Sequence, residues 1–177
     1  MSEPHQSQTD QPQARALGVT SLEVSVSKQT LSAVQSDDST IIYSIATASN
    51  GVGQQFGSEC TPLGEHRIRA KIGGGCPLNT VFIGRRASGE LYSEDLARRQ
   101  PSRDWILTRI LWLCGNQPGF NRLGDCDTMR RYIYIHGAPD AHAMGVPSSH
   151  GCIKMRNTDV VDLYERVAAG TPVFINA

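Results

Sequence analysis

The sequence predicts a mainly β fold, a sandwich or barrel with one helix near its C-terminal end. Apolar and polar residues begin to alternate at about residue 20, as at Leu22, Val24 and Val26. Glycines, prolines and asparagines then interrupt the chain at short intervals, which favours a sheet over alternating strands and helices. The C-terminal region contains the one segment with a clear helical period.

The first half of the chain contains several stretches with strand character, separated by turn-forming residues. The first stretches form a predicted hairpin and a following strand, and the later ones either alternate or are rich in β-branched residues. In order, they are 22–26, 31–34, IIYSIAT at 41–47, HRIRAKIG at 66–73 and TVFIGR at 80–85.

The segment WILTRILWL at 105–113 is apolar nearly all round. Such a run fits either a buried strand or a buried helix, because periodicity cannot separate the two. Its isoleucines and tryptophans, followed by Gly115, favour a strand.

A clearer alternation occurs in RRYIYIH at 130–136. Successive side chains of a strand point to opposite faces, so Tyr132, Tyr134 and His136 share one face. Ile133 and Ile135 share the other. The pattern predicts a strand that ends at His136.

The predicted helix covers NTDVVDLYERVAAG at 157–170. Asn157 or Thr158 can cap its start, and Gly170 followed by a proline can end it. VFIN then supplies a last short strand. The apolar face of the helix consists of Val160, Leu163, Tyr164 and Val167.

Length and composition favour one domain in a reducing compartment. The 177 residues carry 17 basic and 17 acidic side chains, so no overall charge favours nucleic acid or an anionic membrane. Five widely spaced cysteines without a CxxC pair do not resemble a disulfide scaffold. The sequence contains no run of about 18 apolar residues, so no membrane-spanning helix is predicted.

Residues 1–19 are rich in Gln, Ser and Pro, which predicts a polar tail before a single domain at 20–177. This tail contains no apolar run of the kind found in secretory signals. We therefore expect a cytoplasmic protein, or a periplasmic one if the true start lies upstream.

The segment HGAPDAHAMGVPSSHGC at 136–152 gathers residues with several possible roles. It could bind zinc, but its histidines and cysteine lack the close paired spacing of zinc sites, so no metal is predicted. It could be a structural loop in which Cys152 is a small buried apolar residue. It could also be a site of thiol catalysis.

The thiol reading is favoured when the residues are taken together. A cysteine with a pKa near 8.5 needs a neighbouring base to become a good nucleophile at neutral pH, and His136 is a candidate base. The small residues of the Ser-His-Gly-Cys stretch would let backbone N–H groups approach an oxyanion.

The segment YIYIHGAPDAHAMGVPSSHGCIKMRN resembles the active-site signature of the L,D-transpeptidase catalytic domain, the YkuD family. In that family a His-Gly pair is followed by Ser/Thr-His-Gly-Cys, a hydrophobic residue and usually Arg. TPLGEHRIRAKIG at 61–73 and NTDVVDLYERVAAGTPVFI resemble further parts of the family, so the likeness covers about 20–176.

The resemblance implies a mostly β catalytic domain with its C-terminal helix packed beside the active-site loop. It implies that Cys152 is the nucleophile and that His136, oriented by the Gly137 carbonyl, is its base. The oxyanion hole would consist of the Gly151 and Cys152 N–H groups with His150 nearby, and Ser149 would support the turn rather than attack.

The candidate substrate-binding residues are Tyr134, Met144 and Lys154, although Met144 also fits a packing role. Lys154 stands where the family usually has arginine, and a lysine cannot form the same bidentate pair with a carboxylate. Twelve residues, 137–148, separate His136 from Ser149, which is short for the family and predicts a small lid.

The implied reaction is acyl transfer from a peptidoglycan tetrapeptide or muropeptide through a thioester, without a cofactor. With water as acceptor, the protein would be an L,D-carboxypeptidase of cell-wall recycling, and this is the activity that we expect. With an amine as acceptor, it would be a transpeptidase forming 3-3 cross-links. A non-catalytic peptidoglycan-binding module is the alternative of another class. Carbapenem-type β-lactams would acylate Cys152 in either enzyme.

Overall fold

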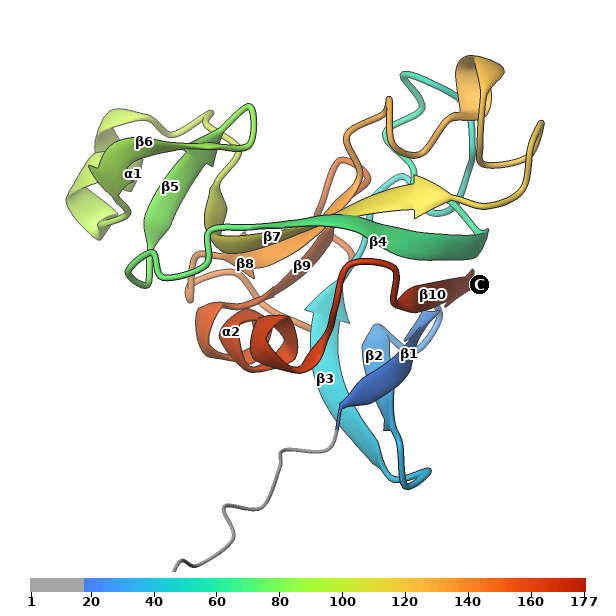
Figure 1. Cartoon of the computed structure of the whole chain (residues 1–177). Helices are drawn as coiled ribbons and strands as arrows, with labels where there is room; N and C mark the ends of the chain where they lie inside the picture. Colours follow the sequence, from blue (N-terminus) through green and yellow to red (C-terminus); the bar gives the residue numbers. More distant parts are fainter. Residues whose placement is uncertain (1–17) are drawn as a thin grey trace, which may run out of the picture.

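Strands close into a barrel in the computed structural model, which describes residues 18–177 (Figure 1). The ring runs β4-β10-β1-β2-β3-β9-β8-β7 and closes through pairing of β7 with β4. The strands are β1 (Val19–Ser25), β2 (Thr30–Gln35), β3 (Thr40–Ala46), β4 (Gly64–Ile72), β5 (Thr80–Ile83), β6 (Arg86–Leu91), β7 (Ile106–Gly115), β8 (Tyr134–Ala138), β9 (Ile153–Arg156) and β10 (Pro172–Asn176). The helices are α1 (Glu94–Arg99), the short 3-10 helix η1 (Gly124–Cys126) and α2 (Asn157–Arg166).

The mainly β prediction is confirmed, with a closed barrel as the architecture. Two strand pairs are parallel, β1 with β10 and β8 with β9, and the other pairs are antiparallel. Closure gives each ring strand two hydrogen-bonded neighbours, so the ring leaves no exposed strand edge.

The main core fills the barrel with every second residue of its strands. Leu22 and Val24 of β1 contribute as their alternation predicts, and Ile135 of β8 is fully buried among them. The apolar face of α2 joins the same core through Val160, Leu163, Tyr164 and Val167.

A second layer lies outside the ring. The hairpin of β5 and β6, followed by α1, projects from β7 on one side of the barrel (Figure 1). Phe82 of β5 packs there against Ile110 and Tyr134. Strand β7 is therefore covered on both faces, by the barrel core and by the hairpin, which explains why its sequence is apolar nearly all round. The strand prediction for 105–113 is confirmed.

Helix α2 packs against β7, β8 and β9, the strands that carry the candidate site. It ends at Arg166, earlier than the predicted 157–170, and its N-cap is Arg156 without a side-chain cap. The expected capping by Asn157 or Thr158 is therefore wrong. The Asn157 side chain is buried and makes hydrogen bonds towards β7 and β8 instead.

The predicted tail at 1–19 lies mostly outside the described residues, and β1 begins at Val19. The other predicted strands agree with the structure, with two exceptions. Strand β5 ends at Ile83 rather than at 85, and β8 starts at Tyr134 and continues past His136 to Ala138. Within residues 18–177, no helix combines the length and apolar character needed to cross a bilayer.

Candidate active site

The register of two parallel strands brings the predicted residues together. His136 of β8 pairs with Lys154 of β9, and Ile135 pairs with Ile153. Because side chains alternate along a strand, Tyr134 and His136 face the same side as Cys152 and Lys154. This side is outside the barrel core, since Ile133, Ile135 and Ile153 point inwards. The alternation predicted for 130–136 is confirmed from Ile133 to His136, whereas Tyr132 lies in a turn before β8 with φ +56°.

The turn before Cys152 is held by Ser149, which is buried. Its hydroxyl donates a hydrogen bond to the Cys152 carbonyl and accepts one from the Gly151 N–H at 3.2 Å. Gly151 has φ +127°, and a Cβ there would lie 3.0 Å from Ile133 Cδ1, so the position requires glycine. Ser149 thus contacts the backbone of the turn, as expected.

The Gly151 N–H is expected to point into an oxyanion hole, but in this structure it donates a hydrogen bond to the Ser149 hydroxyl. The Cys152 N–H has no hydrogen-bond acceptor among the described residues. Of the two predicted backbone donors, Cys152 is therefore the one free to bind an oxyanion.

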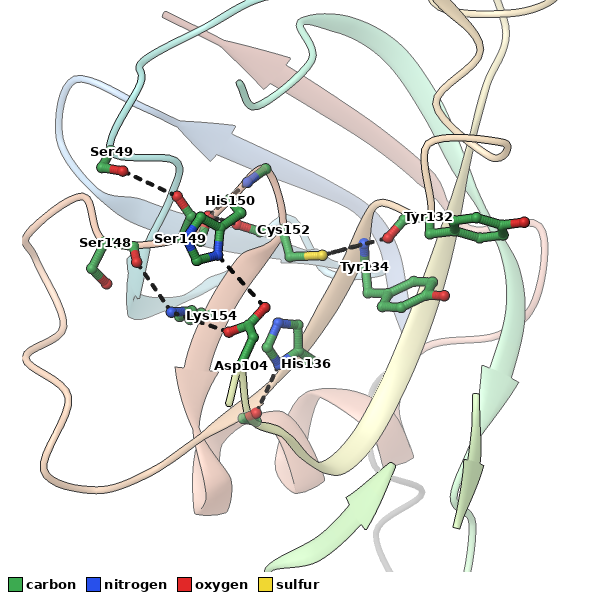
Figure 2. A network of polar contacts seen from close by, with 12 residues as sticks. Ser49, Asp104, Tyr132, Tyr134, His136, Ser148, Ser149, His150, Cys152 and Lys154 are labelled. Atoms are coloured by element: carbon green, nitrogen blue, oxygen red, sulfur yellow. Dashed lines mark hydrogen bonds and ion pairs between the residues drawn. The ribbon is translucent and has the colours of Figure 1, made fainter. Parts of the chain in front are cut away.

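The backbone of the following residue fixes the orientation of His136. Nδ1 lies 2.8 Å from the Gly137 carbonyl oxygen, so Nδ1 carries the proton and donates it to that carbonyl. Nε2 is buried and has no hydrogen-bond partner among the described residues. Figure 2 shows this edge of the ring turned towards Asp104 and Cys152. The imidazole therefore offers a free lone pair, as a general base requires.

A buried cluster of polar side chains contacts the backbone next to Gly137. Thr108 donates to Asn157 Oδ1 at 2.5 Å, and Asn157 Nδ2 donates to the Ala138 carbonyl and to Asn79 Oδ1, both at 3.0 Å. Thr108 has φ +70° and lies where the β7–β8 register shifts, directly after Leu107, which pairs with Gly137. Irregular strand positions of this kind often aim residues at active sites.

The Cys152 thiol is half-buried and contacts the backbone of two tyrosines (Figure 2). Sγ accepts a hydrogen bond from the Tyr134 N–H at 3.3 Å and donates one to the Tyr132 carbonyl at 3.5 Å. Burial raises the pKa of the Cys152 thiol to about 12, although the Tyr134 N–H acts in the opposite direction.

Burial also lowers the pKa of His136, and the hydrogen bond to Gly137 opposes this only in part. Both pKa shifts therefore disfavour the charged thiolate–imidazolium form of the pair. The two groups are not hydrogen-bonded to each other, because Sγ contacts Tyr132 and Tyr134 and His136 Nε2 has no partner.

A carboxylate, Asp104, lies between two basic side chains of the site. Its oxygens are 3.8 Å from His150 Nδ1 and 3.9 Å from Lys154 Nζ (Figure 2). Its negative charge favours the protonated form of His136 and thus raises the pKa of that imidazole. The His150 side chain is exposed, whereas Lys154 is buried and donates to the Ser148 carbonyl at 3.1 Å.

The other expected substrate-binding residues occupy different settings. Tyr134 is buried, and its hydroxyl accepts a hydrogen bond from Arg85 at 3.1 Å. Met144 lies half-buried in the segment after β8, which is the predicted lid. The roles assigned to Tyr134, Met144 and Lys154 stay predictions.

Two cavities include residues next to or within the Ser-His-Gly-Cys turn. One of about 210 Å³ is lined by Phe56, Gly57, Glu59, Arg131, Tyr132, Ile133 and His150. It adjoins a cavity of about 370 Å³ that shares Phe56 and Tyr132. A separate cavity of about 340 Å³ is lined by His142, Ala143, Val146 and Ser148.

The sequence did not indicate Asp104, Thr108 or the bonding role of Asn157. Asp104 and Thr108 lie more than twenty residues before the signature, and pairing of β7 with β8 brings them to it. The Asp and Thr positions have no local pattern that marks them. In residues 18–177, no group of three His, Cys, Asp or Glu side chains is arranged to hold a metal ion.

These features define a class of protein: a β-barrel that carries a cysteine thiol and an imidazole with a free ring nitrogen on one face of two neighbouring strands. This arrangement is suited to acyl transfer through a thioester. The sequence model of the YkuD family, described as the L,D-transpeptidase catalytic domain, matches residues 20–175. The chain belongs to this family.

Solved structures of L,D-transpeptidases have the same fold. L,D-transpeptidase 3 from Mycobacterium tuberculosis, with a faropenem-derived adduct, is 17% identical with a TM-score of 0.57, covering 90% of this chain and 61% of its own. The Mycobacterium smegmatis enzyme is 15% identical with a TM-score of 0.52, covering 90% and 59%. A cysteine-to-serine mutant from Enterococcus faecium is 16% identical with a TM-score of 0.53, covering 90% and 50%.

This chain therefore spans about three fifths or less of the length of these relatives' chains. A comparison with curated protein sequences gives no significant match.

Proposed function

We propose that this protein transfers acyl groups of peptidoglycan stem peptides through a thioester on Cys152. The observation that carries the proposal is the state of His136. Gly137 holds Nδ1, which leaves a buried Nε2 lone pair on the same strand face as the Cys152 thiol. Family membership then indicates the substrate class, a stem peptide ending in diaminopimelate–D-alanine.

The chemistry begins with rotation of the Cys152 side chain from the two tyrosines towards His136. Nε2 takes the thiol proton as sulfur attacks the diaminopimelate carbonyl, and the Cys152 N–H binds the oxyanion. The C–N bond then breaks, and the imidazolium gives its proton to the departing D-alanine amine. Asp104 favours the imidazolium while it exists.

We further propose that water is the main acceptor, which would make the protein an L,D-carboxypeptidase. Supporting this choice, the segment between His136 and Ser149 is short, and residues 141 and 143 to 148, apart from the half-buried Met144, are exposed. A short, open lid leaves the thioester accessible to water and offers few side chains for holding a second peptide.

Cross-linking is the second candidate, and one observation favours it. The cavity lined by His142, Ala143, Val146 and Ser148 is separate from the cavity beside Tyr132 and His150. Two cavities next to one turn could hold a donor and an acceptor peptide. In that case the acyl group passes to an amine of a second stem peptide.

The test is to incubate the purified protein with a disaccharide tetrapeptide and identify the products by mass spectrometry. Loss of one D-alanine alone supports the carboxypeptidase, and a cross-linked dimer supports the transpeptidase. Cys152→Ala is the inactive control, and Cys114→Ala, which removes a buried thiol away from the signature, is the matched control expected to retain activity. Binding without any product would leave only a peptidoglycan-binding module.

A penem or carbapenem provides an independent test of the thiol. A relative carries a faropenem-derived adduct, and we expect faropenem to add its mass to this protein at Cys152. Peptide mapping locates the adduct. An unchanged intact mass would contradict the catalytic proposal even if the stem peptide tested were a poor substrate.

A cytoplasmic recycling role completes the proposal. All five cysteines are free thiols, and Cys60 and Cys76 are only half-buried, which suits a reducing compartment. Fractionation of cells that express the full-length protein tests this location. Recovery with the periplasmic fraction would instead favour cross-linking of the wall.

A further inference from the structure

Arg85 occupies an unusual position at the tip of the hairpin outside the barrel. Gly84 and Arg85 form the two-residue turn between β5 and β6, with Ile83 paired to Arg86. Their φ values are +53° and +66°, a conformation that asparagine and glycine adopt more easily than arginine. The turn therefore does not need arginine for its own geometry.

Two aromatic rings hold the Arg85 guanidinium. Its central carbon lies 4.4 Å from the centre of the Trp112 ring and 5.0 Å from that of Tyr132. It also donates a hydrogen bond to the Tyr134 hydroxyl at 3.1 Å. A cation held against ring faces is pre-oriented, so less side-chain entropy is lost when it binds a ligand.

The same tyrosines contact the nucleophile. The Tyr134 N–H donates to Cys152 Sγ, and the thiol donates to the Tyr132 carbonyl. Figure 2 shows both rings on the opposite side of Sγ from Ser148 and Lys154. Tyr134 therefore connects the two groups, with its N–H at Sγ and its hydroxyl at the Arg85 guanidinium. Tyr132, which lies against the same guanidinium, also lines the cavity next to His150.

Most of the donors of Arg85 are unused. An arginine has five N–H donors, and within residues 18–177 Arg85 makes the one hydrogen bond to Tyr134 and no ion pair. Arg131 differs, because it donates to the carbonyls of Gly53, Gln54 and Cys60 and so supports the fold. The free planar edge of Arg85 matches a carboxylate.

We propose that Arg85 binds a carboxylate of the stem peptide that lies away from the cleaved bond. This inference rests on the proposed function. The D-alanine carboxylate is only three bonds from the reacting carbonyl carbon, whereas the contacts to Sγ and to Arg85 lie at opposite ends of Tyr134. The remaining carboxylates are the α-carboxylate of the γ-linked D-glutamate and the side-chain carboxylate of diaminopimelate. Arg85 is thus a substrate-binding residue that selects acidic stem peptides.

The experiment compares Arg85→Gln with Arg86→Gln on three tetrapeptides. Arg86 is the matched control, since it is the adjacent arginine and is exposed. The peptides are the free acid, the form amidated at D-glutamate and the form amidated at the diaminopimelate side chain. We expect Arg85→Gln to lower kcat/KM for the free acid by about 10-fold or more, mainly through KM.

The amidated peptides identify the carboxylate. Wild type loses the same factor on the peptide whose recognised carboxylate is amidated, and Arg85→Gln has no further effect on that peptide. Arg85→Lys keeps the charge without the planar fork and is expected to restore part of the preference. Thermal unfolding of each variant checks that the fold is retained.

Other outcomes separate this inference from the proposed function. If wild type cleaves the free acid and Arg85→Gln slows all three peptides equally, Arg85 has a structural role and the inference is wrong. An Arg86→Gln effect of the same size would also contradict it. If wild type neither binds nor cleaves any of the peptides, the proposed function itself is overturned, and this inference with it.

Discussion

The surroundings of Cys152 and His136 favour the neutral forms of both side chains. The half-buried thiol contacts two backbone groups, and the imidazole is buried with one free nitrogen. Both burial effects disfavour charge, raising the pKa of Cys152 and lowering that of His136. In the proposed reaction, transfer of the Cys152 proton to His136 would therefore accompany attack on the substrate.

Alkylation of Cys152 by iodoacetamide tests this resting state. Because the thiolate is the nucleophile, we expect the rate to rise about tenfold per pH unit between pH 7 and 10. Quantitative peptide mapping follows Cys152 separately from the half-buried Cys60 and Cys76. A rate that levels off below pH 8 would instead indicate a thiolate–imidazolium pair.

At the scale of single elements, the irregularity in β7 helps to position the backbone next to His136, the candidate base. Thr108 leaves the regular strand, and its hydroxyl connects through Asn157 to the backbone beside Gly137. This leaves no room for a side chain at Gly137. A Cβ there would lie 2.7 Å from the Leu107 carbonyl oxygen and would also overlap Asn157 Oδ1.

Gly137→Ala is therefore expected to move β8 away from β7 and to turn the carbonyl that orients His136. We expect faropenem acylation to slow by about 100-fold, and the free energy of unfolding to fall by about 1 to 3 kcal/mol. Intact-mass kinetics and urea unfolding measure the two effects. Gly18→Ala is the control, because a Cβ there meets no atom within 4 Å; equal behaviour of the two variants would contradict the argument.

The elements differ in how well the sequence predicted them. Strands with one buried face, such as β1 and β8, have a clear alternation, whereas β7 is covered on both faces and its pattern was ambiguous. The start of α2 was assigned a side-chain cap because asparagine favours that position. Tertiary hydrogen bonds to Thr108 and Ala138 use that asparagine instead, and no local pattern reveals this.

At the scale of the whole molecule, barrel closure assembles the site from distant segments. The signature at 136–152 identified Cys152 and His136, since both belong to one strand–loop–strand unit. Asp104 lies just before β7, and Arg85 lies in the turn of the outer β5–β6 hairpin. Only the folded barrel brings these two residues near the signature. The spacing of residues along the sequence does not show which distant segments lie together in the fold.

A buried histidine makes the stability of the whole barrel depend on pH. His66 of β4 contacts the Gly64 carbonyl through Nδ1 and Thr128 through Nε2, and burial lowers its pKa to about 4. The unfolded chain takes up a proton near pH 6.5 that the folded His66 does not accept until about pH 4. The contribution of His66 to the free energy of unfolding is therefore fully present above pH 6.5 and is lost as the pH falls towards 4.

We expect the free energy of unfolding to decrease by about 2 to 4 kcal/mol between pH 7 and 4 through this group, with a contribution of the same sign from His136. Urea unfolding across this range measures the slope. His66→Gln is expected to be less stable at pH 7 and to show a smaller slope. His150→Gln replaces an exposed imidazole and serves as control; an unchanged slope in His66→Gln would refute the assignment.

Strand β8 divides two tasks between its odd and even positions. Ile133 and Ile135 fill the barrel, and Tyr134 and His136 serve the site. Deletion of one residue between 133 and 136 would exchange these sets, so that an imidazole enters the core and an isoleucine faces the substrate. The length of this strand must therefore stay constant both for the packing of the barrel and for the geometry of the candidate site.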